Sequence, residues 1–178
     1  PNHLFALNNL GIIFKELGQI EKAKNYYEKA IRINPNYANA LNNLGVVFGK
    51  LRDNQKAKDC YEKAIKINPN YADAHNNLGI IFEKLGDLQK AKECYERAIE
   101  INPNYADAHY NIGIIFNELG DLQKAKECYE KAIEINPNYT EAHNNLGVVF
   151  RKLGENQKAK ECYKKAIEIN PNHSAAHN

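Results

Sequence analysis

The sequence predicts an all-α protein, an α-solenoid of stacked helix-turn-helix repeats, and three observations support this prediction. All six prolines recur with a period of 34 residues, which is typical of repeat proteins. Within each period, two segments carry apolar residues at the 3.6-residue spacing of a helix. A short polar turn separates the two segments. The prolines are Pro1, Pro35, Pro69, Pro103, Pro137 and Pro171.

We expect residues 1–178 to form one array fragment. A single repeat of this size cannot bury its apolar face alone, so neighbouring repeats must stack against each other. Partial repeats are expected at residues 1–3 and 174–178. The five full repeats are expected at about residues 4–37, 38–71, 72–105, 106–139 and 140–173.

Repeat three illustrates the first helix of each repeat. Leu78 and Phe82 follow the helical period, which predicts a helix over residues 72–85. Asn70 is expected to cap this helix, and Asp73 completes an arrangement that resembles a capping box. Each repeat therefore begins with an amphipathic helix.

A turn and a second helix follow. Gly86 is expected at the left-handed position after the first helix, and Asp87 is expected to cap a second helix over residues 88–101. Repeat two carries Arg52 in place of the turn glycine, which we expect to cost about 1 kcal/mol for a left-handed backbone. The prolines then end each second helix.

A glycine lies in the middle of every first helix, where it costs about 0.5–1 kcal/mol relative to alanine. In repeat three this residue is Gly79, on the face predicted to pack against the second helix. Ala91 and Ala98 are expected to face it, so that the two helix backbones approach closely. We interpret the glycine as a packing requirement, and a larger side chain there is expected to overpack the contact.

The opposite face of the first helix carries an asparagine in every repeat. A carboxamide offers two N–H donors and an oxygen acceptor, so we expect the column to hold an extended chain by its backbone. A merely solubilising surface is the alternative. Branched apolar residues beside the column are expected to contact ligand side chains or, alternatively, to be half-buried against the next repeat. The predicted groove comprises Asn9, Asn43, Asn77, Asn111, Asn145, Asn42, Asn76, Tyr110, Ile12, Val46, Ile80, Ile114 and Val148.

Eight positions recur in phase with few exceptions, and in repeat three they are Leu78, Gly79, Phe82, Gly86, Ala91, Tyr95, Ala98 and Pro103. On these residues the chain resembles the tetratricopeptide repeat family. The resemblance implies a right-handed superhelix in which the asparagine-bearing faces line a concave groove. It also implies a scaffold without catalytic activity that binds a protein or an extended peptide.

The asparagine column is similar to the asparagine ladder of the O-linked N-acetylglucosamine transferase and its SPINDLY relatives. Strings such as NNLGVVF also resemble the repeats of these proteins. In that group the ladder holds acceptor proteins by their main chain, and a glycosyltransferase domain follows the repeats. The resemblance implies an alternative function, the recruitment of substrates for a protein O-glycosyltransferase whose catalytic domain is not represented here.

Composition and motifs argue against several other functions. The 24 basic and 22 acidic residues give a net charge of +2, so we expect no binding of nucleic acid or of an anionic membrane. No apolar run is long enough to span a membrane. No catalytic pairing of serine or cysteine with histidine and no phosphate-binding glycine loop is present, so we expect no enzymatic activity and no cofactor.

Recurring histidines and cysteines are interpreted as packing residues. Ligands one repeat apart cannot converge within about 2.1 Å of a single metal ion, so no metal site is expected. Cysteines at the same spacing are too far apart for disulfides, which favours a reducing compartment, cytoplasmic or nuclear. The histidines are His75, His109, His143 and His177, and the cysteines are Cys60, Cys94, Cys128 and Cys162.

The two ends of the array carry no polar capping helix, which repeat arrays need for solubility. Leu4, Leu7 and Leu10 have no preceding second helix to pack on, and residues 174–178 are too few to cover the helix predicted at 156–169. The sequence therefore predicts fraying of that helix or end-to-end self-association with a second copy. A purely architectural array remains a further alternative.

Overall fold

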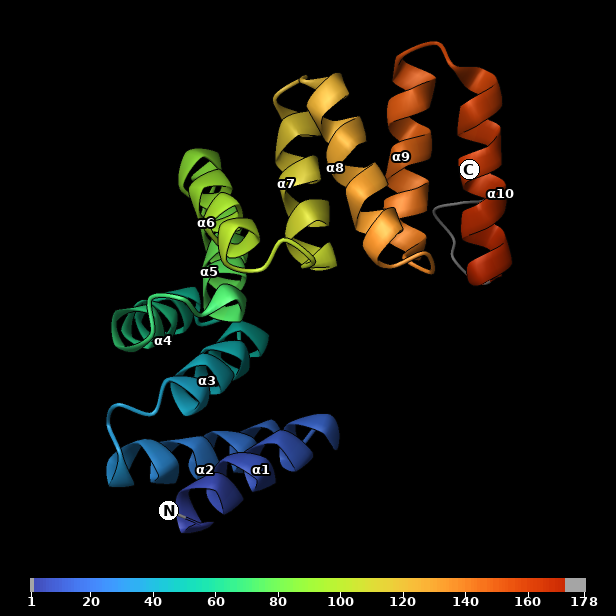
Figure 1. Ribbon diagram of the computed structural model, residues 1–178. Coiled ribbons are helices and arrows are strands. Elements are labelled where there is room, and N and C mark those ends of the chain that lie inside the picture. Colours follow the sequence, from blue (N-terminus) through green and yellow to red (C-terminus); the bar gives the residue numbers. More distant parts are fainter. Residues whose placement is uncertain (1, 172–178) are drawn as a thin grey trace. The chain divides into compact units, whose positions relative to one another are not determined.

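The computed structural model describes residues 2–171, and this part of the chain consists of α-helices joined by short turns (Figure 1). No strand occurs within these residues, which confirms the predicted all-α fold. The expectations for residues 174–178, His177 included, lie outside the described range. The helices are α1 (Asn2–Glu16), α2 (Ile20–Ile33), α3 (Ala38–Lys50), α4 (Asn54–Ile67), α5 (Ala72–Lys84), α6 (Leu88–Ile101), α7 (Ala106–Glu118), α8 (Leu122–Ile135), α9 (Thr140–Lys152) and α10 (Asn156–Ile169).

Repeats one, two, four and five each form one antiparallel pair of neighbouring helices. The chain divides into two compact units, residues 1–94 and 95–178, with the boundary inside α6. In the first unit α1 packs on α2 and α3 on α4, and each second helix also contacts the first helix of the next repeat. In the second unit α7 packs on α8, α8 on α9, and α9 on α10. Successive repeats therefore share apolar surface within each unit.

The starts of the first helices correct one expectation. The N-cap residue of α5 is Tyr71 rather than Asn70, and the Tyr71 side chain makes no capping hydrogen bond. Instead the Asn68 Oδ1 accepts a hydrogen bond from the Asn70 backbone N–H at 3.2 Å. Pro69 between them has no N–H, so the asparagine side chain closes the turn around the proline. The same bond joins Asn34 to Asn36, Asn102 to Asn104, and Asn136 to Asn138.

The second helices begin as predicted, with an aspartate cap in the three middle repeats. The Asp87 Oδ1 accepts a hydrogen bond from the Lys90 backbone N–H at 3.2 Å. Asp53 and Asp121 cap α4 and α8 in the same way. Hydrogen bonds from the lysine side chains and backbones hold the pKa of all three carboxyl groups below the usual value.

The turn between the helices of a repeat requires a left-handed residue. Gly86 has φ +79°, as predicted from its place after the first helix. Arg52 takes the same place in repeat two with φ 60°, and it is the one non-glycine residue with positive φ in the described part of the chain. A side chain in this conformation brings its Cβ too close to the following carbonyl oxygen.

We expect Arg52→Gly to raise the free energy of unfolding by about 1 kcal/mol, because glycine adopts this conformation without the steric penalty. Arg52 is exposed, so the substitution removes little packing. Urea denaturation followed by circular dichroism measures the change. The matched control is Gly86→Arg, for which the midpoint should shift in the opposite direction. Equal midpoints for all three proteins would contradict the proposed strain.

In repeats one, two, four and five the glycine of the first helix packs against a tyrosine ring, which differs from the alanine contact expected at Gly79 in repeat three. A Cβ built on Gly45 would lie 2.5 Å from the Tyr61 Cε1 atom, closer than real Cβ atoms approach a neighbour. The contact recurs wherever the structure defines it, at Gly11–Tyr27, Gly113–Tyr129 and Gly147–Tyr163. The glycine therefore makes room for an aromatic ring of the second helix of its own repeat.

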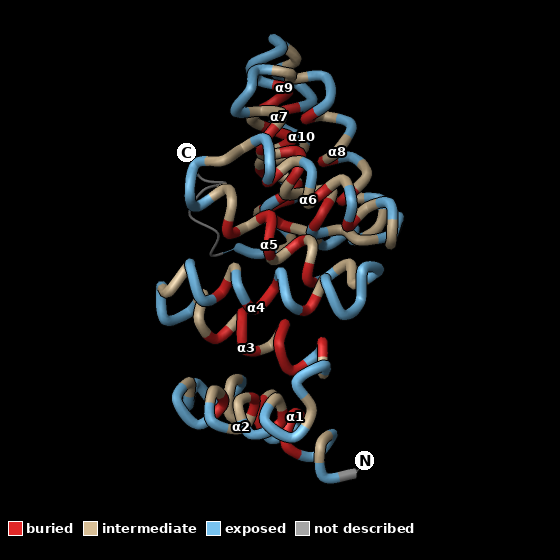
Figure 2. The backbone as a smooth tube through the Cα atoms, turned by 90° about the vertical axis from the view of Figure 1, so that its left-hand side faces the viewer, coloured by how far each residue is buried: buried red, intermediate tan, exposed pale blue. Residues whose placement is uncertain are grey.

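Alanines complete the core on the second helices, with Tyr27, Tyr95 and Tyr129 fully buried between them. Figure 2 shows the buried positions as red stretches along the helices of both units. The alanines keep neighbouring helices close, while Tyr27 and Tyr129 fill the space that Gly11 and Gly113 leave. The alanines without exposed surface on these helices are Ala23, Ala30, Ala57, Ala64, Ala91, Ala98, Ala125, Ala132 and Ala166.

Candidate functional site

The predicted groove residues lie on one face of each first helix, on α1, α3 and α5 of the first unit and on α7 and α9 of the second unit. In each unit we call this face of the first helices the groove face. The column asparagines Asn43, Asn77, Asn111 and Asn145 are half-buried, and Asn9 is exposed. The apolar residues Ile12, Val46, Ile80, Ile114 and Val148 are all half-buried. They therefore take part in packing and keep some surface open to a ligand.

Hydrogen bonds between repeats hold the column asparagines in place. The Asn43 Nδ2 donates to the Asn8 Oδ1 at 3.1 Å, and the Asn77 Nδ2 donates to the Asn42 Oδ1 at 3.1 Å. Both pairs are 35 residues apart in the sequence. Each bond joins the column asparagine of one repeat to the neighbouring asparagine of the repeat before it. Sequence reasoning missed this pairing, although the recurring Asn-Asn dipeptide was its visible signal.

A tyrosine takes the acceptor role in the second unit. Tyr110 stands in place of the first asparagine of the dipeptide, and its hydroxyl accepts a hydrogen bond from the Asn145 Nδ2 at 3.1 Å. The Tyr110 ring packs against those of Tyr129 and Tyr139, with centroids 5.8 and 4.9 Å away. The tyrosine thus keeps the bond between repeats and adds apolar contact area.

Two predicted groove residues are buried beneath the column. Asn42 and Asn76 are only 5% and 4% exposed, and the Asn42 side chain lies between α3 and α5. Asn42 acts through its acceptor oxygen, which orients the Asn77 amide. A carboxamide has two N–H donors and one oxygen, so a single bond between repeats leaves Asn43 and Asn77 with one N–H and the oxygen. These remaining groups can pair with a peptide backbone.

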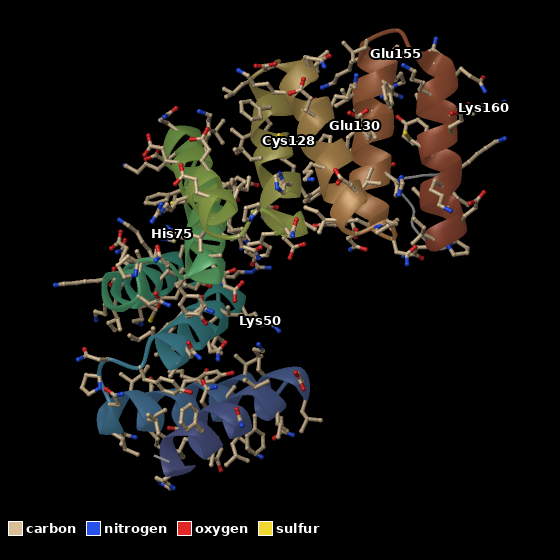
Figure 3. The ribbon with its side chains drawn as sticks, in the orientation of Figure 1. Lys50, His75, Cys128, Glu130, Glu155 and Lys160 are labelled. Carbon is tan, nitrogen blue, oxygen red and sulfur yellow. The ribbon has the colours of Figure 1, made fainter. Side chains whose placement is uncertain are left out.

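Each described histidine of this series contacts a backbone carbonyl in the loop that precedes its own helix. The His75 Nε2 lies 3.0 Å from the Pro69 carbonyl oxygen, so the ring closes the loop before α5. Figure 3 labels His75 on this helix. His109 and His143 make the same contact with Pro103 and Pro137, at 2.9 and 3.0 Å. Within residues 2–171, no group of three or more potential ligands is placed to hold a metal ion.

The four cysteines are free thiols in environments that disfavour the reactive thiolate. Burial raises the pKa of the Cys60 thiol to about 11 and that of Cys94 to about 12. The same cause raises the pKa of Cys128, labelled in Figure 3, and of Cys162 to about 11. Thiols with raised pKa values react slowly near neutral pH, so these residues serve packing.

One hollow of the first unit lies on the groove face and has a volume of about 320 Å³. Side chains of α3 and α5 form its walls, and Tyr61 reaches it from α4. Three predicted groove residues, Val46, Asn77 and Ile80, line it. Five residues outside the predicted groove line it as well, and they are Gly49, Lys50, Tyr61, Ile81 and Lys84. A larger hollow of about 470 Å³ lies at Pro35 and Lys63, away from this face.

The family models match the repeats in the phase that the prolines mark. A model described as the tetratricopeptide repeat matches residues 38–71, 72–105, 106–139 and 140–173. These four matches cover more than half of the chain. The chain belongs to the tetratricopeptide repeat family. A second model, described as a TPR repeat, matches residues 6–51.

Several solved structures are similar to this tetratricopeptide repeat protein. MamA is 27% identical with a TM-score of 0.75, and the alignment covers 95% of this chain and 92% of MamA. YrrB, described as a TPR protein with an unusual peptide-binding site, is 28% identical with a TM-score of 0.72, covering 96% and 88% of the two chains. PilF of Pseudomonas aeruginosa shares the fold with a TM-score of 0.91 at 23% identity, covering 98% and 80%. No curated protein sequence matches the chain.

Among residues 2–171 no helix is both long enough and apolar enough to cross a membrane. Proteins of this repeat fold are in general interaction scaffolds without catalytic activity.

Proposed function

We propose that this tetratricopeptide repeat protein binds an extended peptide or protein segment along its groove face and has no catalytic activity of its own. The observation that carries the proposal is the pair of bonds that orient the Asn43 and Asn77 amides one repeat apart. Preorganised donors and acceptors cost little conformational entropy when a ligand binds. Half-buried Val46 and Ile80 beside them supply apolar contact for ligand side chains.

A similar solved structure supports the binding of a peptide. YrrB is described as having an unusual peptide-binding site, and it is similar to this chain over most of its length. The amide spacing of one repeat suits a ligand whose backbone runs across successive first helices. Ligand side chains then contribute less than the ligand main chain, so we expect broad sequence tolerance.

The asparagine column also favours a second candidate, the recruitment of substrates for a protein O-glycosyltransferase. In this case the groove face holds acceptor proteins by their main chain. The sequence that follows the repeats in the parent protein decides between the two, because this candidate requires a domain that binds a nucleotide sugar. A cytoplasmic or nuclear location stays a prediction. Self-association also stays a prediction, with Phe5, Leu10 and Ile13 exposed on α1.

Selection of peptides from an unbiased display library, followed by titration calorimetry, tests the main proposal. Asn43→Ala combined with Asn77→Ala is expected to weaken binding about tenfold or more, because each lost net hydrogen bond is worth about 1 kcal/mol. Asn25→Ala is the matched control, since Asn25 is an exposed asparagine on α2, away from the groove face.

Recognition of the ligand backbone can be tested by changing the peptide itself. N-methylation of single peptide bonds in a selected peptide should weaken binding more than alanine substitution of the same residues. Circular dichroism melting checks that the double variant remains folded, since both changes also remove bonds between repeats. Unchanged affinity in a folded double variant would contradict the proposal.

A further inference from the structure

We propose that the hollow between α3 and α5 is an acid-selective subsite that takes the carboxylate side chain of an internal glutamate or aspartate in the bound segment. The inference rests on the proposed function, because it names one class of side chain that the same groove face recognises. The subsite is the hollow lined by Val46, Gly49, Lys50, Tyr61, Asn77, Ile80, Ile81 and Lys84.

The missing side chain at Gly49 opens the subsite. A Cβ built on Gly49 would meet no atom within 4 Å, so neither close packing nor positive φ requires glycine here. Glycine inside a helix costs about 0.5–1 kcal/mol relative to alanine, and here no structural requirement offsets this cost. Every other repeat carries a larger side chain at the equivalent position, namely Lys15, Glu83, Asn117 and Arg151. A side chain of that size on Gly49 would project into the subsite.

Two lysines give the rim of the subsite a positive charge. Lys50 and Lys84 hold equivalent positions in successive repeats, and both line the hollow. Figure 3 labels Lys50, which is the last residue of α3. Neither ammonium group forms an ion pair with a residue of the described part of the chain. Lys152, at the equivalent position of repeat five, instead donates a hydrogen bond to the Asn117 Oδ1 at 2.8 Å.

The chemistry of the lining fits an acidic side chain better than a purely apolar one. Val46, Ile80 and Ile81 can cover the methylene groups of a glutamate, and the two ammonium groups can pair with its carboxylate. Asn77 lies at the same place, so the residue that holds the ligand backbone adjoins the residues that read the side chain. A ligand backbone that pairs with the Asn43 and Asn77 amides and continues beyond them places an internal residue at the subsite.

The test uses a peptide selected against the full chain that contains at least one internal acidic residue. Lys50→Glu combined with Lys84→Glu should lower the affinity for this peptide at least tenfold, with a larger loss at low salt. Glu→Gln or Asp→Asn at the critical peptide residue should lower affinity for the wild-type protein and restore binding to the reversed variant. Lys160→Glu with Lys164→Glu is the matched control, because it makes the same change in net charge on α10, away from the subsite.

Gly49→Gln tests the space independently of the charge. Glutamine is neutral and favours helix, so this variant should be at least as stable as the parent and should bind the acidic peptide more weakly. Its affinity for a selected peptide without acidic residues should stay within about twofold of the parent value.

Three outcomes would overturn the inference. If peptides lose affinity for the Asn43→Ala, Asn77→Ala variant but bind the Lys50→Glu, Lys84→Glu variant with unchanged affinity, the proposed subsite is wrong. The proposed function is then unaffected. Loss of binding on amidation of the peptide C-terminus, without any effect of internal Glu→Gln, would assign the lysines to a terminal carboxylate. A library that yields no binder would contradict the proposed function and the subsite together.

Discussion

Gly45→Leu is expected to lower the free energy of unfolding by about 3 kcal/mol or more, because it inserts a side chain where a buried aromatic ring already lies. The new Cβ alone would sit 2.5 Å from the Tyr61 Cε1 and 2.9 Å from its Cδ1. Tyr61 is only 4% exposed and packs with Leu78 and Ile81 of the next repeat. The ring therefore cannot move aside without disturbing the contact between repeats.

Urea denaturation followed by circular dichroism measures this effect, and a second glycine of the same helix supplies the control. Gly49 has open space around its Cβ position, so Gly49→Ala should stabilise the protein by about 0.5–1 kcal/mol. Opposite signs at two glycines one turn apart would show that the effect is steric rather than a matter of helix propensity. If Gly45→Leu unfolds like the parent protein, α3 and α4 do not pack as closely as described.

Tyr27→Ala is expected to destabilise the protein by about 3–5 kcal/mol, the usual cost of replacing a large buried aromatic residue by alanine. Tyr27 has no exposed surface and belongs to a cluster with Ala23, Leu44, Val47 and Cys60. Leu44 and Val47 come from the next repeat, so the cavity would lie at the junction between repeats. Thermal or urea unfolding measures the loss.

Tyr27→Phe separates the ring from its hydroxyl and is expected to be neutral or slightly stabilising. The buried Tyr27 hydroxyl has no hydrogen-bond partner within residues 2–171, and removal of an unpaired buried polar group relieves a desolvation cost. Burial, together with nearby Glu16, raises the pKa of Tyr27 to about 12 from an ordinary value of 10.0. A phenylalanine variant that loses as much stability as the alanine variant would contradict this assignment.

The raised pKa of Tyr27 also predicts that the free energy of unfolding decreases at alkaline pH. Above pH 10 the unfolded chain releases the tyrosine proton while the folded chain keeps it, so the unfolded state is favoured as pH rises. The stability that Tyr27 contributes should therefore fall between about pH 10 and about pH 12. Tyr27→Phe should show a weaker decline over the same range, measured by urea denaturation at successive pH values.

Part of the candidate site was predictable from single residues, and part was not. The periodicity placed Asn77 and Ile80 on one face of the first helix, because a helix fixes which residues share a side. The same reasoning could not predict that Asn42 lies buried beneath the column, since that depends on how closely two successive first helices pack. The subsite could not be predicted, because it depends on the absence of a side chain at Gly49. Only the tertiary structure shows that the space beside Gly49 is open and lined by lysines.

The features that the sequence by itself determined are local ones. The repeat period, the helix bounds within about one residue, the aspartate cap of α6 and the left-handed turns at Gly86 and Arg52 all follow from short-range rules of helix formation and termination. The cap predicted at Asn70 was wrong, because two asparagines around Pro69 can satisfy the turn, and the local pattern does not favour one of them.

Only the tertiary structure decided which residues meet between helices. In repeats one, two, four and five the glycine of the first helix faces a tyrosine ring, and Asn43 bonds to Asn8 of the preceding repeat. These contacts depend on the rotation and separation of packed helices, which arise from the sum of many side-chain volumes rather than from any short segment. A repeat sequence therefore specifies its own helix pair in advance, whereas the surface between repeats, where a ligand would bind, exists only after the repeats stack.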